Sequence, residues 1–290
     1  WLVQGSSALA LKAKISPLVV GLTIVAFGTS APELVVSLNA TLSGQGDIAI
    51  GNIVGSNIFN IGVILGVSAT ICPLQVKKQL LRIDIPVMLA ATVLFTILFW
   101  NGTLGRTEGL FFLTGIIIYT IFSLFYSRKH GTEGSSQELE EQPKHWAVDT
   151  LAIVGGLVVL VFASRLLVDN AVSIAKELGV SEAVIGLTIV AAGTSMPELA
   201  TSVVAALKKR TYIAIGNVIG SNIFNLLAVL GLTATIAPVE TNQINWTDML
   251  VMLGTSLLLL PFMRTGFKIG RGEGVVLFVI YIAYTLYLIV

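Results

Sequence analysis

Two stretches of this sequence are repeated almost unchanged, and they decide the fold. GLTIVAFGTSAPELVVSLNA at residues 21–40 matches GLTIVAAGTSMPELATSVVA at residues 186–205 at 14 of 20 positions. AIGNIVGSNIFNIGVILG at residues 49–66 matches AIGNVIGSNIFNLLAVLG at residues 214–231 at 12 of 18 positions. Both pairs are separated by the same 165 residues (186 − 21 and 214 − 49). Unrelated apolar helices share Leu, Val and Ile rather than GTSxPEL and GSNIFN, so the chain consists of two homologous halves.

The composition around these repeats excludes a water-soluble domain. Of the 290 residues, 55% are hydrophobic and only 11% are charged, whereas soluble domains are about 25% charged. The same figures exclude disordered and collagen-like chains, and the single cysteine, Cys72, permits no internal disulfide. The composition therefore predicts an all-α protein that crosses a membrane several times.

Apolar segments long enough to span a bilayer follow one another along most of the chain, since a spanning helix needs roughly 20 apolar residues. A shorter apolar piece, residues 1–12, precedes them. One stretch, residues 127–145, has the composition of a solvated linker, with basic residues followed by several Glu. The spans are expected at residues 18–42, 47–72, 84–101, 108–127, 147–175, 183–207, 212–237, 247–265 and 271–290.

The repeat offset predicts one further helix. Trp1 aligns with Leu166, yet the second half carries an additional apolar run upstream, residues 146–165. We therefore expect this chain to begin inside its first helix, which gives five spans per half and ten in all. Because five is odd, the halves enter the membrane in opposite orientations, an arrangement typical of transporters with a substrate site between the repeats. The predicted units are a first repeat at 1–127, a linker at 128–146 and a second repeat at 147–290.

The positions of the basic residues agree with ten spans. The ten-span arrangement places 14 of the 17 Lys and Arg residues on one side of the membrane and leaves Arg106, Arg165 and Lys176 on the other. Basic residues in short loops mark the cytoplasmic side. We therefore expect the 128–146 linker in the cytoplasm and both termini outside.

Two carboxylates lie inside the apolar spans. Glu33 and Glu198 are repeat mates (198 − 33 = 165), and an ionisable group at membrane depth is a functional candidate by default. An ordinary intramembrane ion pair is disfavoured because neither span has a basic residue near its Glu. Pro32 and Pro197 lack an N–H, which frees the carbonyls of Gly28 and Gly193 from helical hydrogen bonding, and the two glycines are expected to let the backbone unwind there.

Hydroxyl and amide groups accompany both acids. Thr29 and Ser30 precede Glu33 by four and three residues, so their hydroxyls share its face if the segment is helical; Thr194 and Ser195 repeat this pattern before Glu198. In the second motif the same spacing of four joins Ser56 to Asn60 and Ser221 to Asn225. The Gly51/Gly55 and Gly216/Gly220 pairs predict close helix packing, and Asn57 and Asn222 are expected to form interhelical hydrogen bonds. All these candidate ligands are hard oxygen donors, which suit Ca²⁺ and Na⁺ rather than zinc or copper.

GTSAPEL with GSNIFN, repeated as GTSMPEL with GSNIFN, resembles the paired alpha repeats of the sodium/calcium exchanger family of cation/calcium exchangers. The resemblance is to compact prokaryotic-type members, which implies a prokaryotic inner membrane. It also implies ten helices around four central ion sites, and sliding of the first helix and its mate near residues 146–178. It implies that Glu33 and Glu198, with the carbonyls of Thr29 and Thr194, bind calcium, and that Asn60 and Asn225 border the central site. The same two glutamates would share the flanking sodium sites with Ala26, Ser30, Ser56, Ala191, Ser195 and Ser221.

Alternatives remain open at this point. Some prokaryotic members and the potassium-dependent branch of the family carry an aspartate at the position of Asn225. Asparagine at both 60 and 225 leaves two formal charges and favours potassium-independent exchange. Coupling to H⁺ is the first alternative, because either Glu can carry a proton. A passive cation channel and an intramembrane acid hydrolase are weaker alternatives. The expected partners are Ca²⁺, Na⁺ and the lipid bilayer; no cofactor, nucleic acid or partner protein is expected, and the chain is not expected to be an enzyme.

Overall fold

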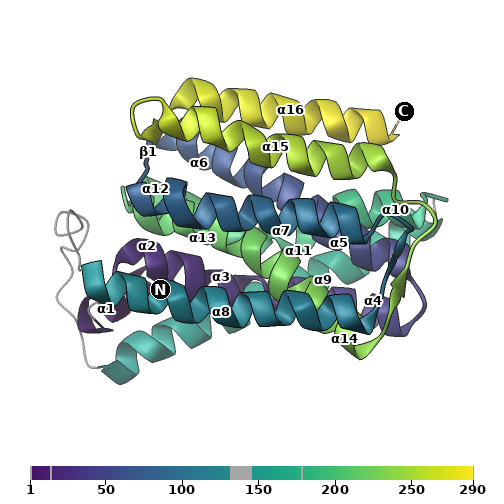
Figure 1. Ribbon diagram of the computed structural model, residues 1–290, viewed down its shortest axis with the longest axis horizontal. Helices are drawn as coiled ribbons and strands as arrows, with labels where there is room; N and C mark the ends of the chain where they lie inside the picture. The colour runs from purple at the N-terminus through teal and green to yellow at the C-terminus, as the bar shows by residue number, and fades with distance from the viewer. Residues whose placement is uncertain (1, 14, 131–145, 178, 290) are drawn as a thin grey trace.

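The computed structural model describes residues 2–13, 15–130, 146–177 and 179–289. The protein is a bundle of helices that run roughly along its long axis (Figure 1). Most of the expected linker, residues 131–145, lies outside the described residues. Arg128 to His130, which were assigned to that linker, form the last turn of α8 instead.

Six helical segments of the described chain are long and apolar enough to cross a membrane without a break. Two of them continue through π-helical turns that begin at the asparagine closing each GSNIFN motif. The six segments are α5 (Gly46–Phe59) with η2 (Asn60–Leu65) and α6 (Gly66–Ile71); η3 (Leu80–Asp84) with α7 (Ile85–Leu98); α8 (Arg106–His130); α13 (Thr211–Phe224) with η5 (Asn225–Val229) and α14 (Leu230–Ile236); α15 (Trp246–Arg264); and α16 (Arg271–Ile289).

Two further spans are broken in the middle, one in each repeat. The first runs through α2 (Pro17–Val20), η1 (Gly21–Val25) and α3 (Ala26–Thr29), then bends by 42° into α4 (Ala31–Leu42). The second runs through α10 (Glu182–Val184), η4 (Ile185–Val190) and α11 (Ala191–Thr194), then bends by 46° into α12 (Met196–Leu207). Each bend lies at the serine of GTSxPEL, just before the proline.

The remaining helices, α1 (Leu2–Ala13) and α9 (Trp146–Glu177), pack against each other. Lys12 of α1 forms an ion pair with Asp149 of α9, with 2.6 Å between Nζ and Oδ2. By the 165-residue offset, α1 corresponds to the second half of the 32-residue α9. The described helices are thus consistent with the ten spans that the repeat predicts.

The sequence did not predict two very short β ladders that join the loops of the two halves. β1 (Leu74–Gln75) pairs antiparallel with β4 (Lys268–Ile269), and β2 (Thr103–Leu104) pairs antiparallel with β3 (Val239–Glu240). The repeat mates of Leu74 and Ile269, which pair in the first ladder, are Val239 (74 + 165) and Leu104 (269 − 165). Val239 and Leu104 pair with each other in the second ladder, so the two ladders have the same register. The fold therefore has an internal pseudo-twofold relation between inverted halves, as predicted.

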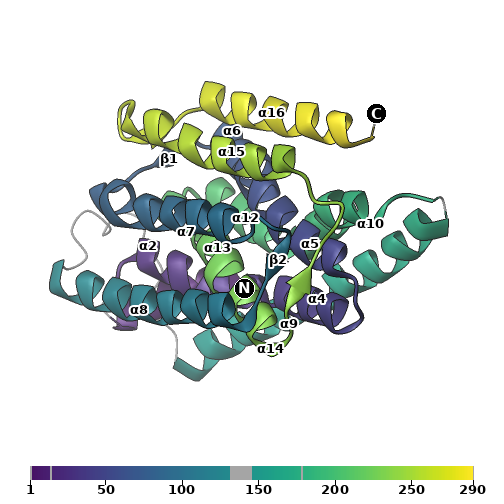
Figure 2. The ribbon, with the colours of Figure 1, turned by 45° about the vertical axis from the view of Figure 1, so that its right-hand side comes forward.

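The halves are interlocked rather than placed side by side (Figure 2). Helix α6 of the first half packs on α16 of the second, and α14 of the second packs on α8 of the first. In the core, α5 packs on η4 and α13 on η1. A Cβ on Gly220 would lie 2.6 Å from the carbonyl oxygen of Leu22, so the predicted packing role of this glycine is confirmed.

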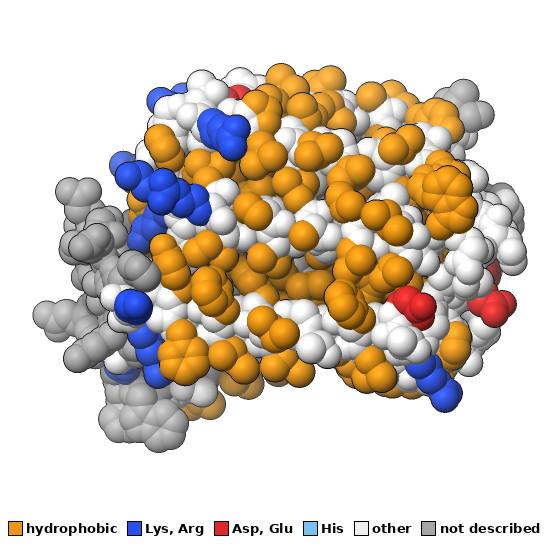
Figure 3. All heavy atoms as spheres, viewed as in Figure 1, with side chains coloured by type: hydrophobic (Ala, Val, Ile, Leu, Met, Phe, Trp, Pro, Cys, Tyr) orange, Lys and Arg blue, Asp and Glu red, His pale blue; other side chains and the backbone are white. Residues whose placement is uncertain are grey.

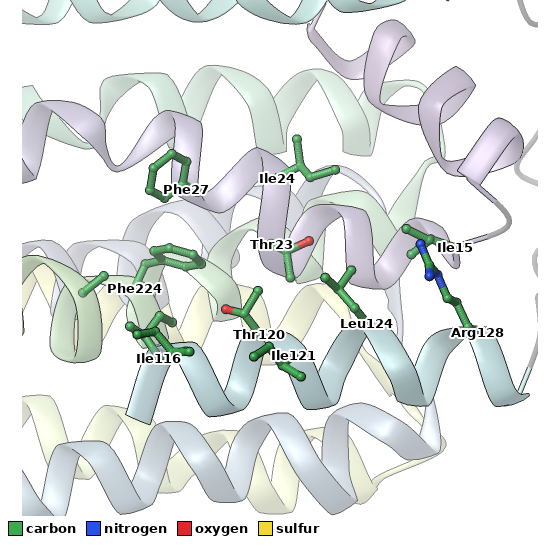
Figure 4. A pocket seen from close by; sticks show the side chains of 12 residues that line it. Ile15, Thr23, Ile24, Phe27, Ile116, Thr120, Ile121, Leu124, Arg128 and Phe224 are labelled. Atoms are coloured by element: carbon green, nitrogen blue, oxygen red, sulfur yellow. The ribbon is translucent and has the colours of Figure 1, made fainter. Parts of the chain in front are cut away.

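The outer surface matches a membrane environment. Figure 3 shows apolar side chains over the middle of one face, with Lys and Arg gathered towards one end. A lipid-facing groove of about 640 Å³ lies between α8 and the segment from η1 to α3, with Arg128 beside Ile15 at one end and Phe27 and Phe224 at the other (Figure 4). This groove is separate from the buried polar centre described next.

Candidate ion-binding site

The two broken helices bring Glu33 and Glu198 into the protein core. The backbone angles of Ser30 (φ −81°, ψ 7°) and Ser195 (φ −82°, ψ 8°) are not helical, and a new helix begins after each serine. Glu33 therefore lies in the first turn of α4, and Glu198 in the first turn of α12. Both side chains are fully buried, and neither forms an ion pair with a described Lys or Arg. The positive end of the new helix favours an anionic group at this position.

Each carboxylate is held by the other half of the protein. Ser195 Oγ donates to Glu33 Oε1 at 2.8 Å, and Ser30 Oγ donates to Glu198 Oε1 at 2.9 Å. Ser221 of α13 also donates to Glu198 Oε1, at 3.3 Å. The two acids therefore form one cross-braced centre at the interface of the repeats.

Thr29 and Ser30 were expected to share a face with Glu33 if the segment is helical. The segment is not one continuous helix, because the chain bends at Ser30, and the Ser30 hydroxyl donates to Glu198 instead. Thr29 Oγ1 donates to the Val25 carbonyl of its own helix at 3.1 Å and lies 3.3 Å from Asn217 Oδ1 of the other half. The four hydroxyl residues do meet at the centre, but across the repeats rather than within them.

Several buried oxygens at the centre have no hydrogen-bond partner among the described residues. Oε2 of both Glu33 and Glu198 is unpartnered, as are Oδ1 of Asn60 and both polar atoms of Asn225. Asn60 Nδ2 donates to Asn222 Oδ1 at 3.0 Å, which confirms the interhelical role predicted for Asn222. Unpaired buried acceptors are costly, so these free carboxylate and amide oxygens are the atoms that a bound cation would satisfy.

The structure adds two residues that the sequence analysis did not select, Asn52 and Asn217. Asn52 Nδ2 donates to the Glu33 carbonyl at 3.3 Å and to Ser37 Oγ at 2.9 Å, while its Oδ1 accepts from Thr194 Oγ1 at 2.9 Å. Asn217 repeats the first two contacts with Glu198 and Ser202. The signal was present: Asn52, Ser56 and Asn60 are spaced by four along one helical face.

The candidate sodium-binding residues also lie at this centre. Ser56 Oγ donates to the Ala191 carbonyl at 3.4 Å, and that carbonyl also accepts from Ser195 N at 3.1 Å. The Ala26 carbonyl accepts from Ser30 N at 2.9 Å. Ala26 and Ala191 begin α3 and α11, so these two carbonyls lie one helical turn before the breaks.

Two other expectations need correction. Gly28 was expected to let the backbone unwind, but it lies within α3, and a Cβ there would be 2.5 Å from Leu157 Cδ1 of α9. The glycine therefore permits close packing of α9, and the bend lies two residues later. Asn57 was expected to bond between helices, yet its Nδ2 donates to the Ile53 carbonyl of its own helix at 2.7 Å.

The donor set at the centre is that of hard cations. No group of three or more His, Cys, Asp or Glu side chains that could hold a metal ion occurs among the described residues. The centre offers instead two carboxylates, surrounded by hydroxyl, amide and carbonyl oxygens. Ca²⁺ takes six to eight such ligands, so the arrangement suits alkali and alkaline-earth ions better than a transition metal.

A cavity of about 390 Å³ lies between α4, α5, α9 and η4, and we call it the α4–α9 vestibule. Its lining includes Val36, three residues after Glu33, and Val190, next to Ala191. Four polar residues also line it: Asn39, Ser43, Gln45 and Ser173.

Comparison with known proteins agrees with this geometry. The profile of the sodium/calcium exchanger protein family matches residues 1–125 and 148–290. The chain is 39% identical over 293 residues to inner membrane protein YrbG of Escherichia coli, covering 97% of this chain and 90% of YrbG. It is 34% identical over 322 residues to sodium/calcium exchanger MaX1 of Methanosarcina acetivorans, covering 98% and 92%.

A solved structure of the sodium-calcium exchanger NCX_Mj, soaked with 2.5 mM Na⁺ and 0.1 mM Sr²⁺, superposes with a TM-score of 0.81. The identity is 35%, and the match covers 98% of this chain and 91% of that chain. The duplicated motifs, the interlocked helices and these matches lead to one conclusion. This chain is a membrane protein of the sodium/calcium exchanger family.

Proposed function

We propose that the protein exchanges Na⁺ for Ca²⁺ across the membrane by alternating access, without a requirement for potassium. The observation that carries this proposal is the pair of buried carboxylates, each braced by a serine of the opposite half and each with a free Oε2. Neither carboxylate pairs with a Lys or Arg among the described residues, so two ionised carboxylates would need positive ions from solution for compensation. The protein is accordingly a transporter rather than an enzyme.

In this proposal Glu33 and Glu198, with the carbonyls of Thr29 and Thr194, bind the calcium ion. Sodium ions occupy flanking sites that share the two glutamates, and Asn60 and Asn225 border the central position. The remaining sodium ligands are contributed by Ala26, Ser30, Ser56, Ala191, Ser195 and Ser221.

Sharing of ligands provides the coupling. A Ca²⁺ ion neutralises both carboxylates at once, and sodium ions that use the same oxygens cannot be held together with it. The site is therefore filled by one kind of ion at a time, and an empty site leaves two charges uncompensated at membrane depth, which is costly. Movement of a loaded site in each direction gives exchange.

The orientation follows from the basic residues. We propose that the side bearing Lys77, Lys78, Lys208, Lys209 and Lys268 faces the cytoplasm, together with the 128–146 linker, and that both termini face outward. The α4–α9 vestibule then opens to the outside.

The test is uptake of ⁴⁵Ca²⁺ by purified protein in sealed vesicles loaded with Na⁺. We expect uptake to require an outward Na⁺ gradient and to proceed equally with K⁺ or choline as the balancing cation. Uptake that needs an outward H⁺ gradient and ignores Na⁺ would establish the H⁺/Ca²⁺ alternative, which either buried carboxyl could serve by carrying a proton. Calcium flux without counterflow of the second ion would instead establish a channel.

A further inference from the structure

The turns that join the two motif helices of each half have the same backbone but carry different side chains. In the first half, Gly44 N donates to the Thr41 carbonyl at 3.0 Å and Gln45 N to the Ala40 carbonyl at 2.8 Å. In the second half, Lys209 N and Arg210 N make the equivalent bonds at 2.9 Å and 2.8 Å. Lys209 even adopts the positive φ of its mate, 58° against 73° for Gly44. The two turns therefore differ in their side chains rather than in their backbone, and we compare the contacts of the repeat mates Gln45 and Arg210.

Gln45 and Arg210 contact different parts of the molecule. Gln45 lines the α4–α9 vestibule, and its Nε2 donates to Glu182 at the start of α10 at 3.2 Å. Arg210 is buried, and its Nη1 donates to the Val3 carbonyl of α1 at 3.2 Å. Arg210 thus bonds the α12–α13 turn directly to the backbone of α1. Gln45 reaches α9 only through Glu182, which pairs with Lys176 of α9 at 3.3 Å.

The two sides of the ion centre differ in the same way. The counterpart of the vestibule is a smaller cavity of about 230 Å³ between α1, α9 and α12, which we call the α1–α12 cavity. Val3, Ala200, Thr201 and Val204 line it, and these are the repeat mates of vestibule residues 168, 35, 36 and 39.

The two cavities differ at the positions that follow the two glutamates. Thr201, three residues after Glu198, is buried and its hydroxyl has no partner among the described residues, whereas its mate Val36 is only half-buried. Apart from Thr201, the lining residues of the cavity are apolar or glycine, so it offers no polar route to a hydrated ion. Arg210 binds α1 at Val3, on the wall of this cavity.

We propose that Arg210 is a positioning residue that keeps the cytoplasmic side of the ion pathway closed by fixing α1 against the α12–α13 turn. This inference rests on the proposed function for the direction of the pathway. Opening of the α1–α12 cavity requires the bond between Arg210 and Val3 to break. Loss of the guanidinium should then shift the protein towards a conformation open to the cytoplasm.

The test measures access to position 201 from the cytoplasm. Thr201→Cys is introduced into a Cys72→Ser background, and labelling by a membrane-impermeant maleimide is followed in inside-out vesicles without ion gradients. Arg210→Gln, which installs the residue of the repeat mate, should accelerate labelling on the order of tenfold, as expected for loss of a charged hydrogen bond. Lys208→Gln removes an exposed charge from the same turn and should leave the rate unchanged. Arg210→Lys, which can still donate one hydrogen bond, should give an intermediate rate.

A second position shows that the variant folds and inserts. Val36→Cys in the vestibule should remain labelled from the outside in the Arg210→Gln protein, and the external KM for Ca²⁺ should rise without loss of maximal rate. Equal labelling of position 201 in the Arg210→Gln and Lys208→Gln proteins would overturn the proposal. The labelling requires no transported ion, so it tests Arg210 independently of the transport assay. Accelerated labelling in a protein that shows no Na⁺-driven Ca²⁺ uptake would support the role of Arg210 and refute the proposed Na⁺/Ca²⁺ exchange.

Discussion

Replacement of Glu198 by Gln tests the ion centre most directly. The side chain is fully buried, and Oε1 accepts hydrogen bonds from Ser30 at 2.9 Å and Ser221 at 3.3 Å. A glutamine Oε1 can accept the same two bonds, so the cross-brace should survive. The change falls on Oε2, the unpartnered oxygen, which is replaced by an NH₂ group that cannot coordinate a cation.

The magnitude follows from the lost charge. Two unit charges 4 Å apart attract each other by about 4 kcal/mol at an effective dielectric constant of about 20. A divalent ion is attracted twice as strongly, so removal of one carboxylate charge costs about 8 kcal/mol of this attraction. We take about half of this cost to be offset, because a neutral amide is easier to bury than a carboxylate. About 4 kcal/mol then remains, which weakens Ca²⁺ binding roughly a thousandfold.

The assay is Na⁺-driven ⁴⁵Ca²⁺ uptake, together with calorimetric titration of Ca²⁺ into the detergent-purified protein. Glu33→Gln should behave like Glu198→Gln, because the two acids are repeat mates with the same bracing. The matched control is Asp84→Asn: Asp84 is equally buried but accepts from Tyr119 at 3.0 Å, away from the centre. Near-normal binding in Glu198→Gln, or an equal loss in Asp84→Asn, would refute the assignment.

Three further predictions address the surroundings of the centre. Asn52→Leu removes the amide that joins the Glu33 carbonyl, Ser37 and Thr194, so unfolding free energy should fall by about 2–3 kcal/mol; an unchanged Tm would contradict this. Cysteines placed at Lys78, Lys209 and Lys268 should be labelled only from the cytoplasm, and labelling of any of them from outside intact cells would rule out the inverted ten-span arrangement. Asn225→Asp places a third carboxyl beside two others, so one should take up a proton or another cation; calcium transport should become more pH-dependent or newly responsive to K⁺, and a profile identical to wild type across pH 6 to 9 would remove Asn225 from the cluster.

Much of this architecture could be read from one offset. The 165-residue repeat predicted the inverted halves. The glycine and proline of each GTSxPEL motif predicted irregular backbone there, and the breaks lie at Ser30 and Ser195. The family resemblance implied that Glu33 and Glu198 lie together. Hydrophobicity predicted the spans to within a few residues, because a bilayer imposes both length and composition on a helix. The family assignment rested on motifs long enough to be specific.

The contacts within the centre could not be read in the same way. Spacing along a helix ranks neighbours only while the helix continues, and the bend at Ser30 exchanges partners between the halves. Ser30 therefore braces Glu198 rather than Glu33, and Asn52 holds a backbone carbonyl that no pattern of side chains indicates. The β ladders were missed for a related reason, since two residues per strand leave no periodicity.

The exchange of partners also explains why the site and the conformational change belong together. Each carboxylate takes its bracing serine from the opposite half, so neither half alone contains a complete site. Any displacement of the halves relative to each other changes the ligands of both acids at once. Conversely, a cation that draws both Oε2 atoms inward strengthens the contact between the halves. Ion occupancy and the relative position of the repeats are therefore linked through the same four side chains, Ser30, Glu33, Ser195 and Glu198, and this linkage is the physical requirement for coupled exchange.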